Sequence, residues 1–319
     1  MTTKIILDTD PGIDDAMAIL FAEASPEIEL VGLTCVFGNA DIDTSTRNAL
    51  YLKERFGFQC DVAKGASQPL ERPPVGASVA VHGENGFGDV AITEPTISAD
   101  PRPAHQYIID SVKAAPGEIT LVAVGPLTNL ALALQQAPEI TDLVKEVVIM
   151  GGAFGTHDHT GNVTPFAEAN VHDDPHAADI VFTAAWPVTV VGLDVTHEAF
   201  FSNDYIDTLR DTCGEVGEFI WDISRFYLDF YKARMGVDGC FVHDPSAIAY
   251  VIDPSLFEVR KGPIRVVCDG PAEGLTLQKH KDTKHKTDDW ADKPAQSVAV
   301  KVNDQALLDL YLDTMSRFG

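Results

Sequence analysis

Four aspartates crowd into eight residues near the start of the chain: Asp8, Asp10, Asp14 and Asp15. The apolar run 5–7 predicts a buried strand before them, and a helix is predicted to begin at Asp14. Helix capping could explain Asp14 and Asp15 but not all four, and Asp8 and Asp10 would share one face if the strand continued through both. So much negative charge is costly unless a cation neutralises it, and oxygen ligands suit Ca²⁺ or Mg²⁺. The segment therefore predicts a site for a hard divalent cation.

Further polar side chains follow another predicted strand, which ends at Met150. Asn162, Glu168 and Asn170 come within a short stretch after its terminal glycines. Two amides and a carboxylate suit hydroxyl groups such as those of a sugar. The alternative is a polar loop whose side chains satisfy its own backbone.

Two histidines are further candidates for chemistry. His243 and Asp244 precede an apolar helix at 247–251, where Asp244 could be only an N-cap and His243 only its neighbour. His82 lies in a glycine-flanked loop, and an isolated loop histidine is more often a surface residue than a catalytic one.

The elements that must position these residues alternate between strands and helices, which predicts βαβ units and an α/β fold. Strands are predicted at 4–7, 29–36, 119–124, 146–150, 188–193, 264–268 and 297–302. Helices are predicted at 14–24, 44–56, 104–115, 127–136, 175–185 and 305–317. No linker or repeat divides the chain, so we predict a single domain, 1–319, with an open, mostly parallel sheet and helices on both faces. Ligands of such sheets gather at the carboxyl ends of the strands.

Composition narrows the class of partner. The 319 residues carry 48 Asp and Glu against 23 Lys and Arg, a formal net charge of −25. Such a surface repels phosphate backbones, which argues against a general nucleic-acid binder but not against nucleosides, which carry no phosphate. No segment approaches the roughly 18 apolar residues of a membrane span, and no signal peptide is recognisable. Five scattered cysteines indicate reduced thiols and a cytoplasmic protein.

The sequence resembles the calcium-dependent nucleoside hydrolases, the inosine–uridine-preferring nucleoside N-ribohydrolase group. The resemblance rests on an ordered set of segments across nearly the whole chain: 8–16, 38–39, 82–83, 125–129, 150–152, 162, 168–170 and 243–244. It implies a Rossmann-like nucleoside hydrolase fold, hydrolysis of ribonucleosides to nucleobase and ribose, and a homodimer or homotetramer.

The resemblance also implies roles for individual residues. Ca²⁺ would be bound by the carboxylates of Asp10, Asp15 and Asp244 and by the backbone carbonyl of Val124, with Asp10 also the base that takes a proton from the calcium-bound water. Three implied contacts hold the ribose: Asp14 with Asn39 at the 2′-hydroxyl, Asn170 at the 3′-hydroxyl, and Asn162 with Glu168 at the 5′-hydroxyl. His82 and His243 would lie beside the base, and Met150 is a further implied substrate contact. His243 is in addition the candidate proton donor to the departing base.

A helical stretch, 221–235, is expected beside the base. Tyr227, Tyr231 and Arg234 are spaced to share one face of it, and Trp221 is a further aromatic candidate. Such aromatic stripes are more often core than ligand-facing. Because both His82 and His243 are present, the resemblance favours a broad or pyrimidine-leaning base preference.

This chemistry agrees with general principles. Cleavage of an N-glycosidic bond builds positive charge on the ribose, an oxocarbenium-like state that an acidic pocket stabilises. Attack by water from the face opposite the base would invert the configuration at C1′.

Two other functions compete with this one. A haloacid-dehalogenase-like Mg²⁺ phosphohydrolase also opens with a strand and Asp-x-Asp, but it has no place for Asp14 and Asp15, and its phosphate would need basic residues. A catalytically inactive riboside-binding protein would keep the fold without turnover. The segment 275–281 departs from the family pattern, and we expect it to lie outside the site.

Overall fold

The computed structural model describes residues 2–281, 283, 286–288 and 290–318. Its centre is an eight-stranded sheet with the order β3-β2-β1-β4-β5-β6-β12-β9. Neighbouring strands are parallel except for β9, which pairs antiparallel with β12 at one edge. The strands are β1 (Thr3–Thr9), β2 (Ile28–Cys35), β3 (Asp61–Lys64), β4 (Ile119–Ala123), β5 (Glu146–Met150), β6 (Val188–Val191), β9 (Phe257–Gly262) and β12 (Gln296–Val302).

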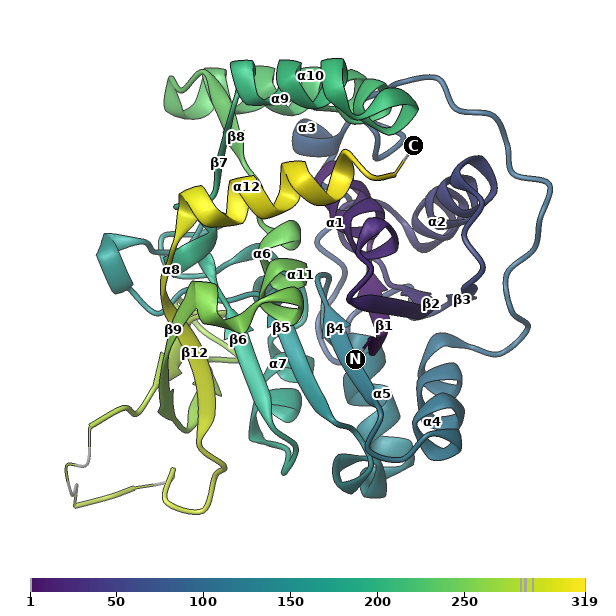
Figure 1. The fold of residues 1–319 in the computed structure, drawn as a ribbon. Helices are drawn as coiled ribbons and strands as arrows, with labels where there is room; N and C mark the ends of the chain where they lie inside the picture. Colours follow the sequence, from purple (N-terminus) through teal and green to yellow (C-terminus); the bar gives the residue numbers. More distant parts are fainter. Residues whose placement is uncertain (1, 282, 284–285, 289, 319) are drawn as a thin grey trace.

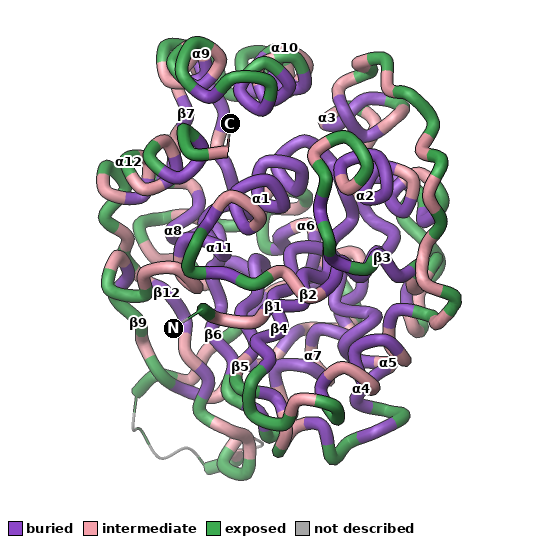
Figure 2. The backbone as a smooth tube through the Cα atoms, turned by 45° about the vertical axis from the view of Figure 1, so that its right-hand side comes forward, coloured by how far each residue is buried: buried purple, intermediate pink, exposed green. Residues whose placement is uncertain are grey.

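The central strands are apolar on both faces because both faces are covered by helices. In β1, Ile5 and Leu7 belong to one buried core while Ile6, between them, belongs to the core on the opposite face. This alternation follows from the two-residue repeat of a strand. The tube in Figure 2 shows these central strands, and most of the helix that follows β1, as buried.

Helices cover the sheet in two layers (Figure 1). One core includes α1 (Ile13–Ala24), α2 (Ile42–Phe56), α11 (Asp244–Ile252) and α12 (Asp304–Met315). The other includes α4 (Ala104–Ala114), α5 (Thr128–Gln136) and α7 (Pro175–Thr183). Local signals fix some of the boundaries: the side chain of Asp41 caps α2 by accepting from the N–H of Thr44, and Gly57 ends it in the left-handed conformation.

Smaller elements complete the fold. A pair of helices crosses the top of the molecule in Figure 1: α9 (Asn203–Thr212) and α10 (Gly214–Met235). The other short helices are α3 (Val79–His82), α6 (Ala169–Asp173) and α8 (Leu193–Thr196). Two small antiparallel sheets pair β7 (Phe200–Ser202) with β8 (Gly239–Phe241) and β10 (Ile264–Val266) with β11 (Thr276–Gln278). The 3₁₀ turns lie at Pro138–Asp142, Thr156–Asp158 and Pro254–Leu256.

The predicted fold class is confirmed, since an open, mostly parallel sheet lies between helices on both faces. Each predicted strand and helix overlaps an observed one, although 264–268 forms a small sheet with β11 instead of joining the central one. The sequence patterns did not reveal the edge strands β3 and β9. Among the described residues, no helix combines the length and the apolar character needed to cross a bilayer.

Candidate functional site

The candidate site lies where the strand order reverses. β1 is flanked by β2 on one side and β4 on the other, and Asp10 and Val124 follow directly after β1 and β4. Connections leave these two strands in opposite directions, which opens a crevice at their carboxyl ends. The chain topology therefore brings Asp10 and Val124 together.

Asp15, in the first turn of α1, is the best-anchored carboxylate of the acidic segment. It accepts hydrogen bonds from the hydroxyl of Thr9, the backbone N–H groups of Asp10 and Gly12, and the amide Nδ2 of Asn39. Asp15 is fully buried. These four donors fix the orientation of its carboxylate at the end of β1.

Two more buried carboxylates face Asp15. Ligand oxygens of Asp14, Asp15 and Asp244 all lie within 4.8 Å of one another. Burial, followed by the charge of Asp15, raises the pKa of Asp14 to about 7. Burial, followed by the charges of Asp14 and Asp15, raises the pKa of Asp244 well above its usual range. Keeping all three buried carboxylates ionised therefore costs free energy, and a bound cation would lower that cost by neutralising their charge.

Asp10 is not one of these three carboxylates, but its charge acts on Asp244. Its Oδ2 accepts the backbone N–H of Asn39 at 2.6 Å, whereas its Oδ1 is buried without a hydrogen-bond partner among the described residues. Burial, followed by the charge of Asp15, raises its pKa well above the usual range. An unpartnered buried oxygen beside three carboxylates, with oxygen donors throughout, fits a hard divalent cation.

Asp8 does not belong to this cluster, although its spacing from Asp10 suggested a shared face. β1 ends at Thr9, and the carboxylate Oδ2 of Asp8 accepts instead from the hydroxyl of Thr34 on β2 and from Nδ2 of Asn129. Burial raises the pKa of Asp8 to about 7.

Glu168 and Asn170 hold the opposite wall. The carboxylate of Glu168 accepts the backbone N–H groups of Gly152, Asn170 and Val171 at 2.8 to 3.1 Å. Burial raises its pKa to about 6. Nδ2 of Asn170 donates to the backbone carbonyl of Val124 at 2.8 Å, which leaves that carbonyl a second lone pair for another ligand.

Asn162 fits both of the alternatives that its sequence context left open. It lines the same cavity as Glu168, but its Oδ1 also accepts the N–H of Ala169 at 3.1 Å. Its backbone carbonyl accepts from Nη2 of Arg234 at 2.7 Å, so the loop is tied to the end of α10.

Both predicted histidines are buried, so the surface alternative for His82 is wrong. Nδ1 of His82 accepts the backbone N–H of Ile13 at 3.1 Å, and burial lowers its pKa to about 3. His243 lies between two hydroxyls: Thr196 Oγ1 is 2.8 Å from Nδ1, and Tyr231 Oη is 2.9 Å from Nε2. Burial, followed by His197, lowers the pKa of His243 well below its usual range. Both rings are therefore neutral near neutral pH.

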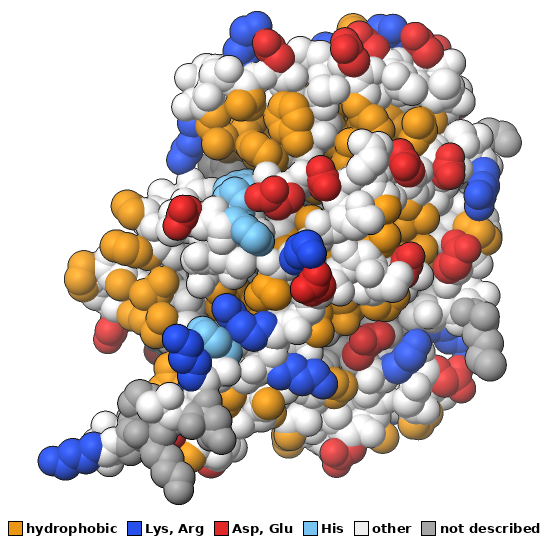
Figure 3. All heavy atoms as spheres, turned by 60° about the vertical axis from the view of Figure 1, so that its left-hand side comes forward, with side chains coloured by type: hydrophobic (Ala, Val, Ile, Leu, Met, Phe, Trp, Pro, Cys, Tyr) orange, Lys and Arg blue, Asp and Glu red, His pale blue; other side chains and the backbone are white. Residues whose placement is uncertain are grey.

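The predicted face of α10 does point into the cavity. Tyr227, Tyr231 and Arg234 all line it, together with Met235. Trp221 points elsewhere, because its indole N–H donates to Asp207 on α9 at 2.7 Å. On the side shown in Figure 3, hydrophobic side chains gather below the top of the molecule, where α9 and α10 lie, and histidines reach the surface beneath them.

These walls enclose a cavity of about 430 Å³, large enough for a small organic ligand. Among the residues predicted to bind substrate or metal, all but Asp10 and Asp15 line it, and these two are buried. The cavity-lining members of the predicted set are Asp14, Asn39, His82, Val124, Met150, Asn162, Glu168, Asn170, Tyr231, Arg234, His243 and Asp244.

Two residues of the site were missed from the sequence. His197 lines the cavity with its ring centroid 5.4 Å from that of His243, and Thr196 holds His243 in place. Both follow the predicted strand 188–193, so polar residues after a strand end were the available signal. The departing segment 275–281 does not line the cavity, as expected, but Thr276 within it bonds to Ala153.

Comparisons with known proteins agree with this geometry. The family model described as inosine-uridine preferring nucleoside hydrolase matches residues 5–309. Uridine nucleosidase 1 of Arabidopsis thaliana is 44% identical over 86% of this chain and 81% of its own length. The inosine-uridine preferring nucleoside hydrolase of Crithidia fasciculata is 39% identical over 100% of this chain and 99% of its own. A solved plant nucleoside hydrolase, PpNRh1, superposes with a TM-score of 0.95 at 37% identity, covering 99% of each chain.

Proposed function

Because the chain belongs to the inosine-uridine preferring nucleoside hydrolase family, whose members are ribonucleoside hydrolases, we propose how its cavity cleaves the N-glycosidic bond. Water attacks C1′ from the face opposite the base, through an oxocarbenium-like state and with inversion. The products are free nucleobase and ribose.

The observation that carries this proposal is the buried carboxylate cluster at one end of a cavity whose other walls present amides, a carboxylate and histidines. Positive charge that develops on the ribose ring is stabilised by fixed negative charge nearby. A neutral or basic pocket of the same shape would oppose that charge.

The proposed cofactor is Ca²⁺, held by Asp10, Asp15, Asp244 and the backbone carbonyl of Val124. When bound, the ion supplies Lewis-acid polarisation of water and of ribose hydroxyls. Asp10 acts as the general base, and its Oδ1 is the oxygen that no hydrogen bond from the described residues occupies. Asn39 keeps the other oxygen of Asp10 fixed through its backbone N–H.

Ribose is held from two sides. Asp14 with Asn39 binds the 2′-hydroxyl, Asn170 the 3′-hydroxyl, and Asn162 with Glu168 the 5′-hydroxyl. The bonds from three backbone N–H groups to Glu168 fix its carboxylate before substrate arrives. Such preorganisation lowers the entropy lost in reaching the reactive geometry.

The base lies between His82, His243 and the α10 residues Tyr231 and Arg234, with Met150 also contacting substrate. His243 assists the departing base as a neutral imidazole hydrogen-bonded to the Tyr231 hydroxyl. The base preference is broad or pyrimidine-leaning, which the two cavity histidines support. The names of the uridine nucleosidase and the inosine-uridine preferring relative point the same way.

We also propose that the enzyme is a cytoplasmic homodimer or homotetramer of single-domain chains. The cytoplasmic location is supported by five free cysteines, four of them buried. The oligomeric state follows the family resemblance, and analytical ultracentrifugation of the full chain tests it.

The phosphohydrolase alternative fits this cavity poorly. Among the described residues that line it, Arg234 is the sole Lys or Arg, and its Nη2 is already bonded to Asn162. A phosphate would face the carboxylates of Asp14, Glu168 and Asp244 instead of cations.

The test is a ribose-release assay with inosine, adenosine, guanosine, uridine and cytidine, run for wild type, Asp10→Ala and the exposed-site control Asp222→Asn. We expect release by wild type and the control, and at least about a thousandfold loss in Asp10→Ala. Inversion is read by NMR from the first-formed ribose anomer. If folded, calcium-loaded wild type releases no ribose but still binds ribosides, the inactive-binder alternative replaces this proposal; hydrolysis of phosphate esters instead would favour the phosphohydrolase.

A further inference from the structure

A segment outside the cavity contacts the two chain segments that carry its ribose-binding wall. The hydroxyl of Thr276, at the start of β11, accepts the backbone N–H of Ala153 at 2.9 Å and donates to the carbonyl of the same residue at 2.8 Å. Thr276 is 2% exposed. Its neighbour Leu275 forms an isolated antiparallel bridge with Ala167. Ala153 follows Gly152, and Ala167 precedes Glu168.

These contacts converge on one carboxylate. Gly152 donates its N–H to Oε2 of Glu168 at 2.8 Å, so the backbone that Thr276 fixes is the backbone that orients Glu168. Gly152 has a positive φ of 74°, and a Cβ there would approach the side chain of Thr276 to 3.0 Å. The turn is thus packed directly against Thr276, with no space between them.

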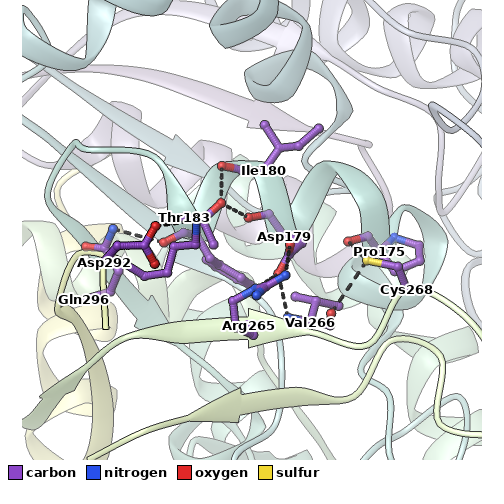
Figure 4. A network of polar contacts seen from close by, with 11 residues as sticks. Pro175, Asp179, Ile180, Thr183, Arg265, Val266, Cys268, Asp292 and Gln296 are labelled. Atoms are coloured by element: carbon purple, nitrogen blue, oxygen red, sulfur yellow. Dashed lines mark hydrogen bonds and ion pairs between the residues drawn. The ribbon is translucent and has the colours of Figure 1, made fainter. Parts of the chain in front are cut away.

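The β10–β11 hairpin, which carries Thr276, is bonded to α7, one of the helices that cover the central sheet. Arg265 on β10 makes two ionic hydrogen bonds to Asp179 on α7, at 2.8 and 2.9 Å, and Asp179 also accepts the N–H of Val266 (Figure 4). In the loop that joins β10 and β11, Glu273 pairs with Arg72 at 3.2 Å. A bidentate arginine–carboxylate pair restricts orientation as well as distance.

We propose that the β10–β11 hairpin is a positioning element for the ribose-binding wall, and that Thr276 is the residue through which it orients Glu168. This rests on the proposed function, in which Glu168 binds the ribose 5′-hydroxyl. Thr276 touches neither substrate nor metal. It acts by satisfying both backbone groups of Ala153, which would otherwise be left without these partners in a buried turn.

The experiment compares two substrates that differ only in the 5′-hydroxyl: the best riboside of the panel, such as uridine, and its 5′-deoxy analogue. The variants are Thr276→Val, which keeps the shape but removes the hydroxyl, Thr276→Ser, which restores it, and the control Thr189→Val. Thr189 is a buried threonine on β6 whose hydroxyl bonds to Tyr250, away from this wall. Base release is followed by chromatography, and thermal unfolding is measured for each variant.

We expect Thr276→Val to lower kcat/KM for the riboside about tenfold, mainly through KM, because a looser Glu168 binds the hydroxyl less well. The same variant should leave kcat/KM for the 5′-deoxy analogue within about twofold of wild type. Thr276→Ser should recover most of the loss in kcat/KM for the riboside. Thr189→Val should show the same ratio of kcat/KM between the riboside and its 5′-deoxy analogue as wild type. If Thr276→Val does not fold, Thr276→Cys, whose thiol is a weak hydrogen-bonding group of similar size, should show the same pattern at smaller amplitude.

Equal losses on both substrates would overturn the inference, since they would mean that Thr276 supports the fold generally. So would an unchanged kcat/KM for the riboside, or a wild type that does not distinguish the two substrates. In all these cases the release of ribose by wild type still supports the proposed function. Only absence of hydrolysis of every riboside by folded, calcium-loaded wild type would contradict that function.

Discussion

The hydroxyl oxygen of Tyr231 lies 2.9 Å from Nε2 of His243. Thr196 occupies the other ring nitrogen at 2.8 Å, so both nitrogens of this buried imidazole have partners within the protein. Because its pKa is lowered, the His243 ring does not carry an extra proton at neutral pH. Any proton that His243 gives to a leaving base must be replaced through one of these two hydroxyls.

Replacing Tyr231 with phenylalanine therefore tests leaving-group assistance. We expect Tyr231→Phe to lower kcat for uridine by about ten- to a hundredfold, because His243 Nε2 loses its partner. A p-nitrophenyl riboside, whose leaving group needs no proton, should lose less than about threefold. Steady-state kinetics on both substrates checks this, with Tyr250→Phe as the control; equal losses on the two substrates would contradict it.

Removal of the metal should lower the unfolding temperature of the protein as well as its activity. We expect Ca²⁺ to raise the unfolding temperature of chelator-treated protein, because it neutralises carboxylates whose burial raises their pKa. At a free concentration of about 100 times Kd the gain is about 2.7 kcal/mol. Differential scanning calorimetry should show the gain in wild type and in Asp222→Asn but not in Asp244→Asn. An unchanged midpoint for wild type at millimolar Ca²⁺ would show that the cluster does not bind this ion.

The buried His82 predicts how stability depends on pH. Its pKa is about 3 when folded and about 6.5 when unfolded, so below pH 6.5 the unfolded state binds a proton that the folded state does not. The free energy of unfolding contributed by His82 is therefore fully present above pH 6.5 and declines as pH falls toward 3, by up to about 1.4 kcal/mol per pH unit.

Urea denaturation between pH 7.5 and 5 measures this contribution. We expect His82→Gln to lose less stability than wild type over that range, by about 1 to 2 kcal/mol, since it has no proton to bind. His280, an exposed histidine, provides the control His280→Gln. If the free energy of unfolding fell by the same amount in wild type and His82→Gln between pH 7.5 and 5, His82 would not be neutral in the folded protein.

Gly38 has a positive φ of 154°, and a Cβ at this position would lie 2.1 Å from Oδ2 of Asp10. We expect Gly38→Ala to displace that carboxylate and lower kcat by at least about a hundredfold. Gly57 also has a positive φ but nothing within 4 Å of its Cβ position. Gly57→Ala should cost about 1 kcal/mol of stability and leave kcat unchanged. Activity and urea denaturation of both variants check the contrast, and full activity of Gly38→Ala would contradict it.

Much of the fold and part of the site could be predicted because the signals are local. Apolar runs marked the buried strands, and polar residues that follow them, such as Asp10 and, further along the chain, Asn170, were expected at one edge of a parallel sheet. Some of the donors that hold the carboxylates are also local. The backbone N–H groups of Asn170 and Val171 bond to Glu168, and the hydroxyl of Thr9 bonds to Asp15.

The remaining contacts join residues far apart in sequence. Thr196 meets His243 across 47 residues, and Thr276 meets Ala153 across 123. Helical spacing placed Tyr231 and Arg234 on one face of α10, but it could not say that Trp221 faces α9, because that depends on how the two helices pack. Residue spacing predicts which side chains share one face of a helix. Which element packs against that face is decided by the tertiary structure.

The order of the acidic residues along the chain has a consequence for synthesis. Asp244 is made more than two hundred residues after Asp10 and Asp15. The strand β12, which lies between β6 and β9, begins later still, at Gln296. A nascent chain therefore carries Asp10, Asp14 and Asp15 long before Asp244 exists. The cluster can form only after Asp244 has left the ribosome, and the sheet only after β12 has, so a chain that terminates before Asp244 cannot assemble this site.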